Sequence, residues 1–178
     1  MSIVLDYGLA APSRKLPILA LSIFDEEGKQ EMDILHINKV IRYFQYLADI
    51  EEVEFSNYNL GAVSYEIEEN MVLLEEYGLI KKKNKNKYDL TDLGKSAVAE
   101  LKVTISEEHL KKLIYSKQIL NDLSFNELLF FMYKLLPETI ENSTQYHILK
   151  KSKEKIINNL LKKGKISKNI AMKWLQDE

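Results

Sequence analysis

A lysine-rich stretch between two short apolar segments constrains the fold more than any other part of the sequence. Residues 79–80 and 88–90 are apolar enough to form strands, whereas residues 81–87 contain five lysines and two asparagines and are too charged for a core. Gly78 before the stretch predicts the end of a helix in a left-handed conformation, and Thr91 after it predicts the N-cap of another helix. A helix, a basic hairpin and a second helix are therefore expected in this order.

Further helices are predicted upstream of this hairpin. Asp33 is the expected N-cap of a helix whose apolar residues recur at spacings of three and four, and Ser64 is the expected N-cap of the next one. A leading helix is predicted over 14–24, after an arm formed by residues 1–13, and a polar loop over 51–60. Helix, helix, loop, helix, basic hairpin, helix is the order of a winged helix-turn-helix domain. The prediction is a mainly α fold with a short β-hairpin wing and a core over 33–103.

The rest of the chain is predicted to be an all-helical extension. Ser106 and Ser167 are expected N-caps, residues 124–127 form a capping-box pattern, and one long helix is expected to end near Lys163. We therefore expect two parts, a winged-helix domain over 1–103 and a helical C-terminal region over 104–178 that packs on it. Residues 1–102 contain 12 Lys and Arg against 18 Asp and Glu, a net charge of −6, and the remainder contains 13 against 9, a net charge of +4.

Composition argues against several function classes. The chain has no cysteine, so disulfides, thiol nucleophiles and thiolate metal sites are absent. The apolar stretch over 16–24 is shorter than the roughly 20 residues of a membrane span, and we expect neither a targeting segment nor a membrane partner. The three histidines lack metal-site spacing. A cytoplasmic protein with no metal, no cofactor and no enzymatic activity is expected.

Four segments carry a resemblance to a known group of proteins. The first is Ile-Asn-Lys-Val-Ile-Arg-Tyr-Phe at residues 37–44, and the second is Tyr-Asn-Leu-Gly-Ala-Val-Ser at residues 58–64. The third is the hairpin with its flanks, which has the patterns L-x-x-x-G-L-I and Y-x-L-T-x-x-G. The fourth, residues 133–143, contains a tyrosine, then a Pro-Glu pair, and then an Asn-Ser pair. Together they resemble the SocA-like antitoxin (Panacea) and YwgA-like family of small prokaryotic winged-helix proteins. Ala62 stands where that family usually has proline. The resemblance implies a regulator or antitoxin-like protein that acts through contacts.

The predicted wing is the first candidate site. Its lysines lie where winged helices touch DNA phosphates, and neutralising several phosphates would give salt-sensitive binding that does not depend on sequence. The alternative is a solvated hairpin whose lysines protect a strand edge. The residues are Lys81, Lys82, Lys83, Lys85 and Lys87.

The helix after Ser64 is the second candidate. It carries five glutamates and no lysine or arginine, and only Asn70 could read a base, so a conventional DNA-recognition helix is not expected. Its acidic face could instead meet a basic protein surface, or simply face solvent. Two tyrosines of the preceding helix could stack on bases, anchor a partner or lie at the core margin. The predicted protein-interaction residues are Tyr43, Tyr46, Glu66, Glu69 and Glu76.

The C-terminal helices are a weaker third candidate. Residues 142–175 contain nine lysines and one acidic residue, a net charge of +8. They could contact nucleic acid, or they could pack on the acidic N-terminal half. The candidate residues are Lys150, Lys151, Lys155, Lys162, Lys163 and Lys168.

These patterns leave two functional hypotheses, and a third, an enzyme, that no constellation of residues supports. The first is a non-enzymatic interaction module, antitoxin-like or a regulatory adaptor, that binds a protein partner such as a toxin or a basic regulator. The second is a DNA-binding transcription regulator that contacts phosphates of duplex DNA through the wing and the basic C-terminal helices. A homodimer fits the second hypothesis, because two weak sets of contacts then add.

Overall fold

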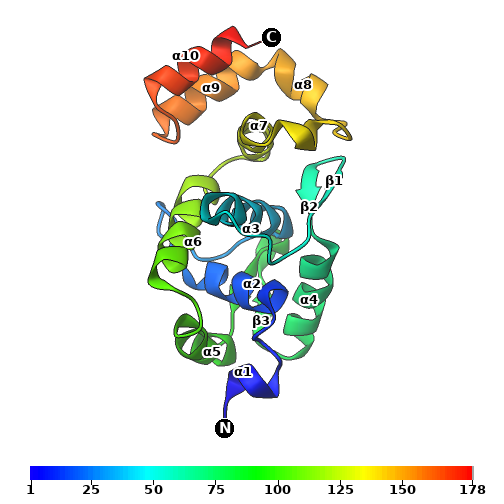
Figure 1. Cartoon of the computed structure of the whole chain (residues 1–178), viewed down its shortest axis with the longest axis vertical. Coiled ribbons are helices and arrows are strands. Elements are labelled where there is room, and N and C mark those ends of the chain that lie inside the picture. The colour runs from blue at the N-terminus through cyan, green and yellow to red at the C-terminus, as the bar shows by residue number, and fades with distance from the viewer. Residues whose placement is uncertain (178) are drawn as a thin grey trace. The chain divides into compact units, whose positions relative to one another are not determined.

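The computed structural model describes residues 1–177 except for the side chain of Lys85. These residues are mainly helical, with ten α-helices and two antiparallel sheets of two strands each (Figure 1). They form two compact units. Unit 1 comprises Met1–Phe55 and Ser64–Asp122, and unit 2 comprises Ser56–Val63 and Leu123–Glu178.

Unit 1 is built around one apolar helix. Its elements are α1 (Ile3–Asp6), α2 (Pro12–Ser22), α3 (Ile34–Ala48), α4 (Tyr65–Glu76), β3 (Ile80–Lys82), β4 (Tyr88–Leu90), α5 (Asp92–Lys102) and α6 (Glu107–Leu120). Helix α2 contacts each of α3, α4, α5 and α6 (Figure 1). Leu16, Ile18, Leu19 and Leu21 of α2 are completely buried. Removing this much apolar surface from water is the main source of stability for unit 1.

The helix starts follow the predicted capping residues. Each predicted N-cap is extended and accepts a hydrogen bond from the backbone N–H three residues later, which satisfies a donor that the helix itself cannot pair. The Ser124–Glu127 capping box also forms in full. The confirmed caps are Asp33, Ser64, Thr91, Ser106, Ser124 and Ser167.

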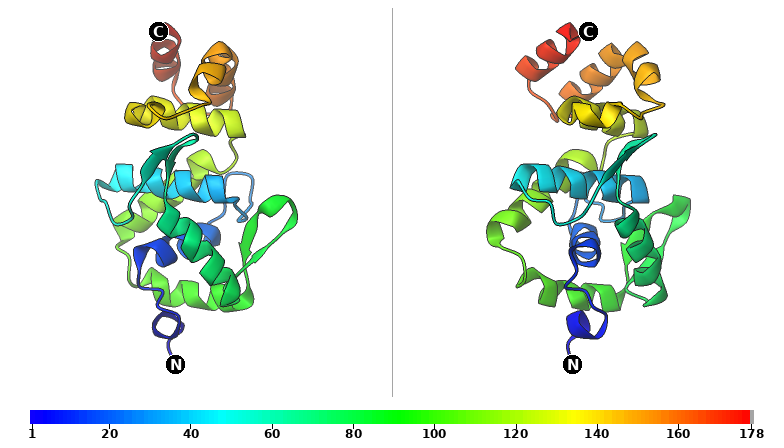
Figure 2. Two further views of the ribbon diagram at one scale, coloured as in Figure 1. Left: turned by 90° about the vertical axis from the view of Figure 1, so that its right-hand side faces the viewer. Right: turned by 45° about the vertical axis from the view of Figure 1, so that its right-hand side comes forward.

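The predicted basic hairpin is present. Strand β3 pairs with β4 in antiparallel register, with Ile80 opposite Leu90. Met32 extends this pair, because its backbone exchanges two hydrogen bonds with Tyr88, at 3.1 and 2.7 Å. Gly78 has φ of 71° at the exit of α4, which is the predicted left-handed position. The hairpin extends away from the helices of unit 1 in both views of Figure 2.

Unit 2 is a helical unit with one small sheet. Its elements are β1 (Ser56–Tyr58), β2 (Gly61–Val63), α7 (Phe125–Leu135), α8 (Tyr146–Lys151), α9 (Lys153–Lys162) and α10 (Lys168–Gln176). Helix α9 packs on both α7 and α10. The indole of Trp174 in α10 meets the rings of Phe130 and Phe131 in α7 edge to face, with centroids 6.1 and 6.0 Å apart. This aromatic cluster joins α10 to α7.

A β-hairpin occupies part of the polar loop predicted over 51–60. The Asn57 side chain donates to the Glu138 carbonyl, and the Asn142 side chain donates to the Asn57 carbonyl at 3.0 Å. The Thr144 N–H donates to the Asn59 carbonyl at 3.2 Å. Residues more than eighty positions later in the chain therefore hold β1, which is why its own composition does not predict a strand.

The N-terminal predictions need two corrections. Residues 1–13 include the short helix α1, because the Glu100 carboxylate accepts hydrogen bonds from Ser2 Oγ and from the N–H groups of Ile3 and Val4. The leading helix begins at Pro12, two residues earlier than predicted, and ends at Ser22 because Ile23 is extended. Proline suits the first helical position, where no N–H is needed.

The C-terminal predictions also need correction. The expected long helix is broken at Ser152, whose φ and ψ of −111° and 14° separate α8 from α9. The boundary between the two units lies after Asp122 rather than after residue 103, because α6 packs on α3 within unit 1. The Ser116 hydroxyl of α6 donates to the Val40 carbonyl of α3 at 2.6 Å.

Candidate interaction surfaces

The outer face of α4, defined here as Tyr65, Glu69, Val72 and Glu76, combines apolar and acidic side chains. These residues follow one another at spacings of four, three and four, so they form one line along the helix. Tyr65 is 54% exposed and Val72 is 56% exposed, and both carboxylates are exposed. The opposite side of the helix is buried and carries Ile67, Met71 and Leu74. A second surface that covers the exposed parts of Tyr65 and Val72 would remove apolar area from water and so stabilise the contact.

Asn70, the only amide side chain of α4, is already engaged by α2. Its Oδ1 accepts a hydrogen bond from Arg14 Nε at 2.8 Å, and its Nδ2 donates to Ser13 Oγ and to the Glu66 carbonyl, both at 2.9 Å. Ser13 Oγ donates in turn to the Glu66 carboxylate at 2.7 Å. Asn70 and Glu66 therefore help to hold α2 against α4. Glu66 is exposed but accepts a hydrogen bond from Ser13, so Glu69 and Glu76 are the predicted carboxylates that belong to the outer face of α4.

The predicted tyrosine anchors differ in exposure. Tyr43 is only 6% exposed, whereas Tyr46 is 47% exposed. Tyr115 of α6 joins them, with its ring centroid 6.4 Å from that of Tyr43, and it is 50% exposed. Burial and then Tyr115 raise the pKa of the Tyr43 hydroxyl. Tyr43 thus lies at the margin of the core. Tyr115 is a surface residue, and spacing in the sequence could not predict that it lies beside α3.

Two of the wing lysines are involved in contacts within the hairpin. The Lys83 ammonium lies 2.8 Å from the Asp89 carboxylate and 3.7 Å from that of Glu31. The hydrogen bond to Asp89 raises the pKa of Lys83. The Lys82 ammonium lies over the ring of Tyr88, 5.5 Å from its centroid. The positive charge of Lys83 is therefore partly balanced within the hairpin.

The remaining wing lysines differ in exposure. Lys81 and Lys82 are exposed, and Lys87 is half-buried. The side chain of Lys85, which was also predicted to contact phosphates, lies outside the described part of the chain. The described part of the hairpin thus offers exposed positive charges at Lys81, Lys82 and the ion-paired Lys83.

The C-terminal lysines are mostly exposed. Lys163 is also exposed, and its ammonium lies 2.6 Å from the Glu127 carboxylate of α7. Burial acts to raise the pKa of Glu127, but the hydrogen bond from Lys163 and the backbone of Ser124 lower it on balance. Lys163 therefore joins α7 to the end of α9. The other predicted residues are exposed: Lys150, Lys151, Lys155, Lys162 and Lys168.

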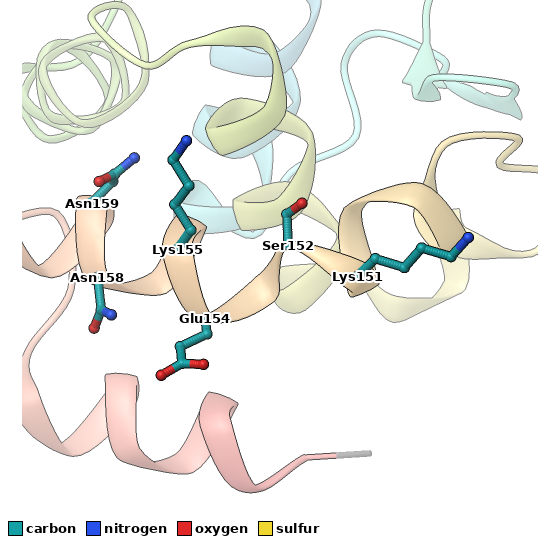
Figure 3. A pocket seen from close by; sticks show the side chains of 6 residues that line it. All are labelled: Lys151, Ser152, Glu154, Lys155, Asn158 and Asn159. Atoms are coloured by element: carbon teal, nitrogen blue, oxygen red, sulfur yellow. The ribbon is translucent and has the colours of Figure 1, made fainter.

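A hollow of about 510 Å³ lies along α9 and is lined by lysines, asparagines, a serine and a glutamate (Figure 3). The side chains of Lys155 and Asn159 extend to one side of the helix, whereas Glu154 and Asn158 extend toward α10. Lys151 extends in a third direction. Because these groups diverge, they do not form a convergent site for a small molecule.

A buried lysine that the sequence analysis did not single out holds unit 1 together. Lys117 of α6 is completely buried, and its Nζ donates to the carbonyls of Ala20 and Gln30 at 2.7 and 2.6 Å. Burial lowers the pKa of Lys117 to about 7, although Asp25 opposes the shift. Lys117 has a structural role, since the carbonyls occupy its donors.

Among the described residues, no group of three or more His, Asp or Glu side chains could hold a metal ion. Within the same part of the chain, no helix has the length and apolar character that a bilayer crossing requires.

Comparisons with protein-family models, curated proteins and solved structures find no match. The resemblance to the SocA-like and YwgA-like family therefore stays a prediction. Two of the segments that carry it, residues 58–64 and 133–143, include parts that lie together in unit 2. The Tyr133 hydroxyl lies 2.6 Å from Ser143 Oγ, and Asn142 donates to the carbonyl of Asn57 beside the first segment.

Proposed function

We propose that this protein is a non-enzymatic winged-helix interaction module, antitoxin-like or a regulatory adaptor, that binds a protein partner through the outer face of α4. The observation that carries the proposal is the pairing of two apolar side chains, each more than half exposed, with two exposed carboxylates on one line of α4. Such a face fits a partner surface with an apolar centre and basic surroundings.

The order of elements in unit 1 supports the winged-helix assignment. Helices α2, α3 and α4 are followed by the β3–β4 hairpin and α5, and Met32 supplies a third strand position beside β4. In that arrangement α4 takes the place of the DNA-recognition helix. Exposed carboxylates would repel phosphates, and Asn70 is engaged by Arg14 and Ser13. A protein ligand for α4 is favoured over a DNA groove for these reasons.

The test reverses the charge of the outer face. A tagged chain carrying Glu69→Lys and Glu76→Lys is compared with the wild type in quantitative co-purification from the cells that produce it. The charge-reversed chain should lose a protein with a basic docking surface that the wild type retains, because like charges then face each other. The matched control is Glu51→Lys with Glu52→Lys, which makes the same charge change at two exposed residues after α3. Equal recovery of every protein by all three chains would contradict the proposal.

A second candidate function is binding of duplex DNA through the wing. The specific observation in its favour is that Lys81 and Lys82 are exposed on a hairpin that extends away from the helices (Figure 2). Contacts from lysines to phosphates release counterions, so affinity would fall as salt rises. The ion pair of Lys83 with Asp89 weakens this candidate, because it balances one of the charges.

Fluorescence anisotropy on duplex DNA at low salt tests the second candidate. Changing Lys81, Lys82, Lys83, Lys85 and Lys87 to Ala should lower affinity and make its salt dependence shallower. A control with Lys95→Ala and Lys102→Ala removes exposed lysines of α5 and should bind as the wild type does. The absence of binding by the wild type at low salt would eliminate this candidate and leave the first one intact.

A further inference from the structure

The two compact units carry opposite net charges. Unit 1 contains 15 Lys and Arg against 21 Asp and Glu, a net charge of −6. Unit 2 contains 10 against 6, a net charge of +4. Two copies of such a chain attract each other when unit 1 of one copy approaches unit 2 of the other.

Helix α10 provides a face that complements the outer face of α4. Lys168, Met172 and Leu175 follow one another at spacings of four and three, so they share one side of α10. Met172 is 60% exposed and Leu175 is 38% exposed, and Lys168 is exposed. This α10 face is therefore apolar and basic, while the buried side of the helix is formed by Ala171 and by Trp174 against α7.

The two faces match in spacing and in charge. On α4, apolar and acidic residues alternate at spacings of four and three, and on α10 a basic residue precedes two apolar ones at the same spacings. Val72 and Met172 can therefore cover each other while Glu69 or Glu76 meets Lys168. Exposed lysines nearby in sequence, such as Lys162 and Lys173, add to the attraction.

We propose that the outer face of α4 binds the α10 face of a second copy of this chain. This inference rests on the proposed use of α4 as a docking face, and it names the occupant of that face. In a pair with twofold symmetry the contact is made twice, since each copy supplies one α4 and one α10. The two contacts reinforce each other and close the assembly at two copies.

Measurement of molar mass tests the proposal. Sedimentation equilibrium on the purified full chain at about 50 mM salt should give a species of twice the 20.8 kDa monomer mass. At about 500 mM salt the dissociation constant should rise at least tenfold, because the pairing is partly ionic. A chain that remains monomeric at low salt over the full range of concentrations overturns the proposal.

A charge-swap experiment then identifies the surfaces. Glu69→Lys with Glu76→Lys, and separately Lys168→Glu, should each weaken the dimer about tenfold. An equimolar mixture of the two variants should restore it, because both contacts of the mixed pair again join opposite charges. Failure of the mixture to restore the dimer overturns the assignment of these two faces. The Glu51→Lys, Glu52→Lys chain should dimerise as the wild type does.

The result also separates this inference from the proposed function. If the chain is monomeric but the α4 variant still loses a basic protein in co-purification, the docking face stands and the second copy is excluded as its occupant. If the α4 variant loses the dimer and no other protein is lost, the second copy is the partner of α4. Circular dichroism of each variant confirms that the helices are intact.

Discussion

Gly94 lies where α5 packs against the backbone of Leu79, just before β3. A Cβ at this position would overlap the Leu79 carbonyl oxygen, which accepts the Thr91 N–H at 3.1 Å, and would also press on the Leu90 side chain. Thr91 additionally caps α5 and donates to the Gly78 carbonyl. The glycine of the Leu-Thr-x-x-Gly motif therefore allows the hairpin and α5 to approach each other.

Gly94→Ala is expected to destabilise the protein by about 1–3 kcal/mol, because the backbone of Leu79 must shift to admit the methyl group. Urea unfolding followed by circular dichroism measures the change. Ser96→Ala, at an exposed position of the same helix, is the control and should change stability by less than about 0.5 kcal/mol. An equal midpoint for Gly94→Ala and the wild type would show that α5 does not approach Leu79 this closely.

Lys117 makes the stability of unit 1 depend on pH. Its pKa is about 7 in the folded chain and lies near 10.5 in the unfolded one, so between these values the unfolded state binds more protons. The free energy of unfolding should therefore rise as pH increases from about 7 to about 10, by at most about 1.4 kcal/mol per pH unit for this group. Lys39 has its pKa lowered to about 7 by burial and acts in the same direction.

Lys117→Met removes this contribution, and urea unfolding at pH values between about 7.5 and 9.5 should show a smaller rise in stability than the wild type. Lys102→Met, at an exposed position of α5, serves as the matched control and should keep the wild-type pH dependence. Identical pH dependence for Lys117→Met and the wild type would mean that Lys117 is charged in the folded protein.

At the level of elements, local signals account for what the sequence predicted. An N-cap acts over three residues, so Asp33, Ser64 and Thr91 could be assigned from sequence alone. The α1 helix and strand β1 could not be predicted, because Glu100 and Asn142 stabilise them from distant parts of the chain. The same distinction applies to function: the acidic composition of α4 was visible in the sequence, whereas its outward line of apolar and acidic residues required the helix boundaries.

The hydrogen bonds of the Asn70 side chain to α2 are a second feature that the sequence alone could not predict. Asn70 is the one residue of α4 that its sequence predicts could read a base, and its partners Arg14 and Ser13 lie more than fifty positions earlier. Tyr115 is a similar case, since it approaches Tyr43 only because α6 packs on α3. Contacts between helices, rather than patterns within them, therefore decided which candidate residues remain available to a partner.

At the scale of the whole molecule, the path of the chain couples the two units. Residues 56–63 belong to unit 2 but lie in sequence between α3 and α4 of unit 1. The chain leaves unit 1 after Phe55 and returns at Ser64, which is also the N-cap of α4. The Ser64 N–H donates to the Asn38 side chain at 2.8 Å, so α3 fixes the point of return. Local unfolding of unit 2 should therefore also destabilise the first turn of α4.

Leu160→Ala tests this coupling. Leu160 is completely buried in α9, and truncating it should destabilise unit 2 by about 2–5 kcal/mol. Hydrogen exchange followed by mass spectrometry should show faster exchange in α7, α9 and residues 56–63, and a smaller increase in the first turn of α4. Exchange in α2 and α6 should stay at the wild-type rate, because their contacts with α3 remain. Ile148→Ala, at a 59% exposed position of the same unit, is the control and should leave exchange unchanged. Equal acceleration in every helix would instead identify the two units as one cooperative body.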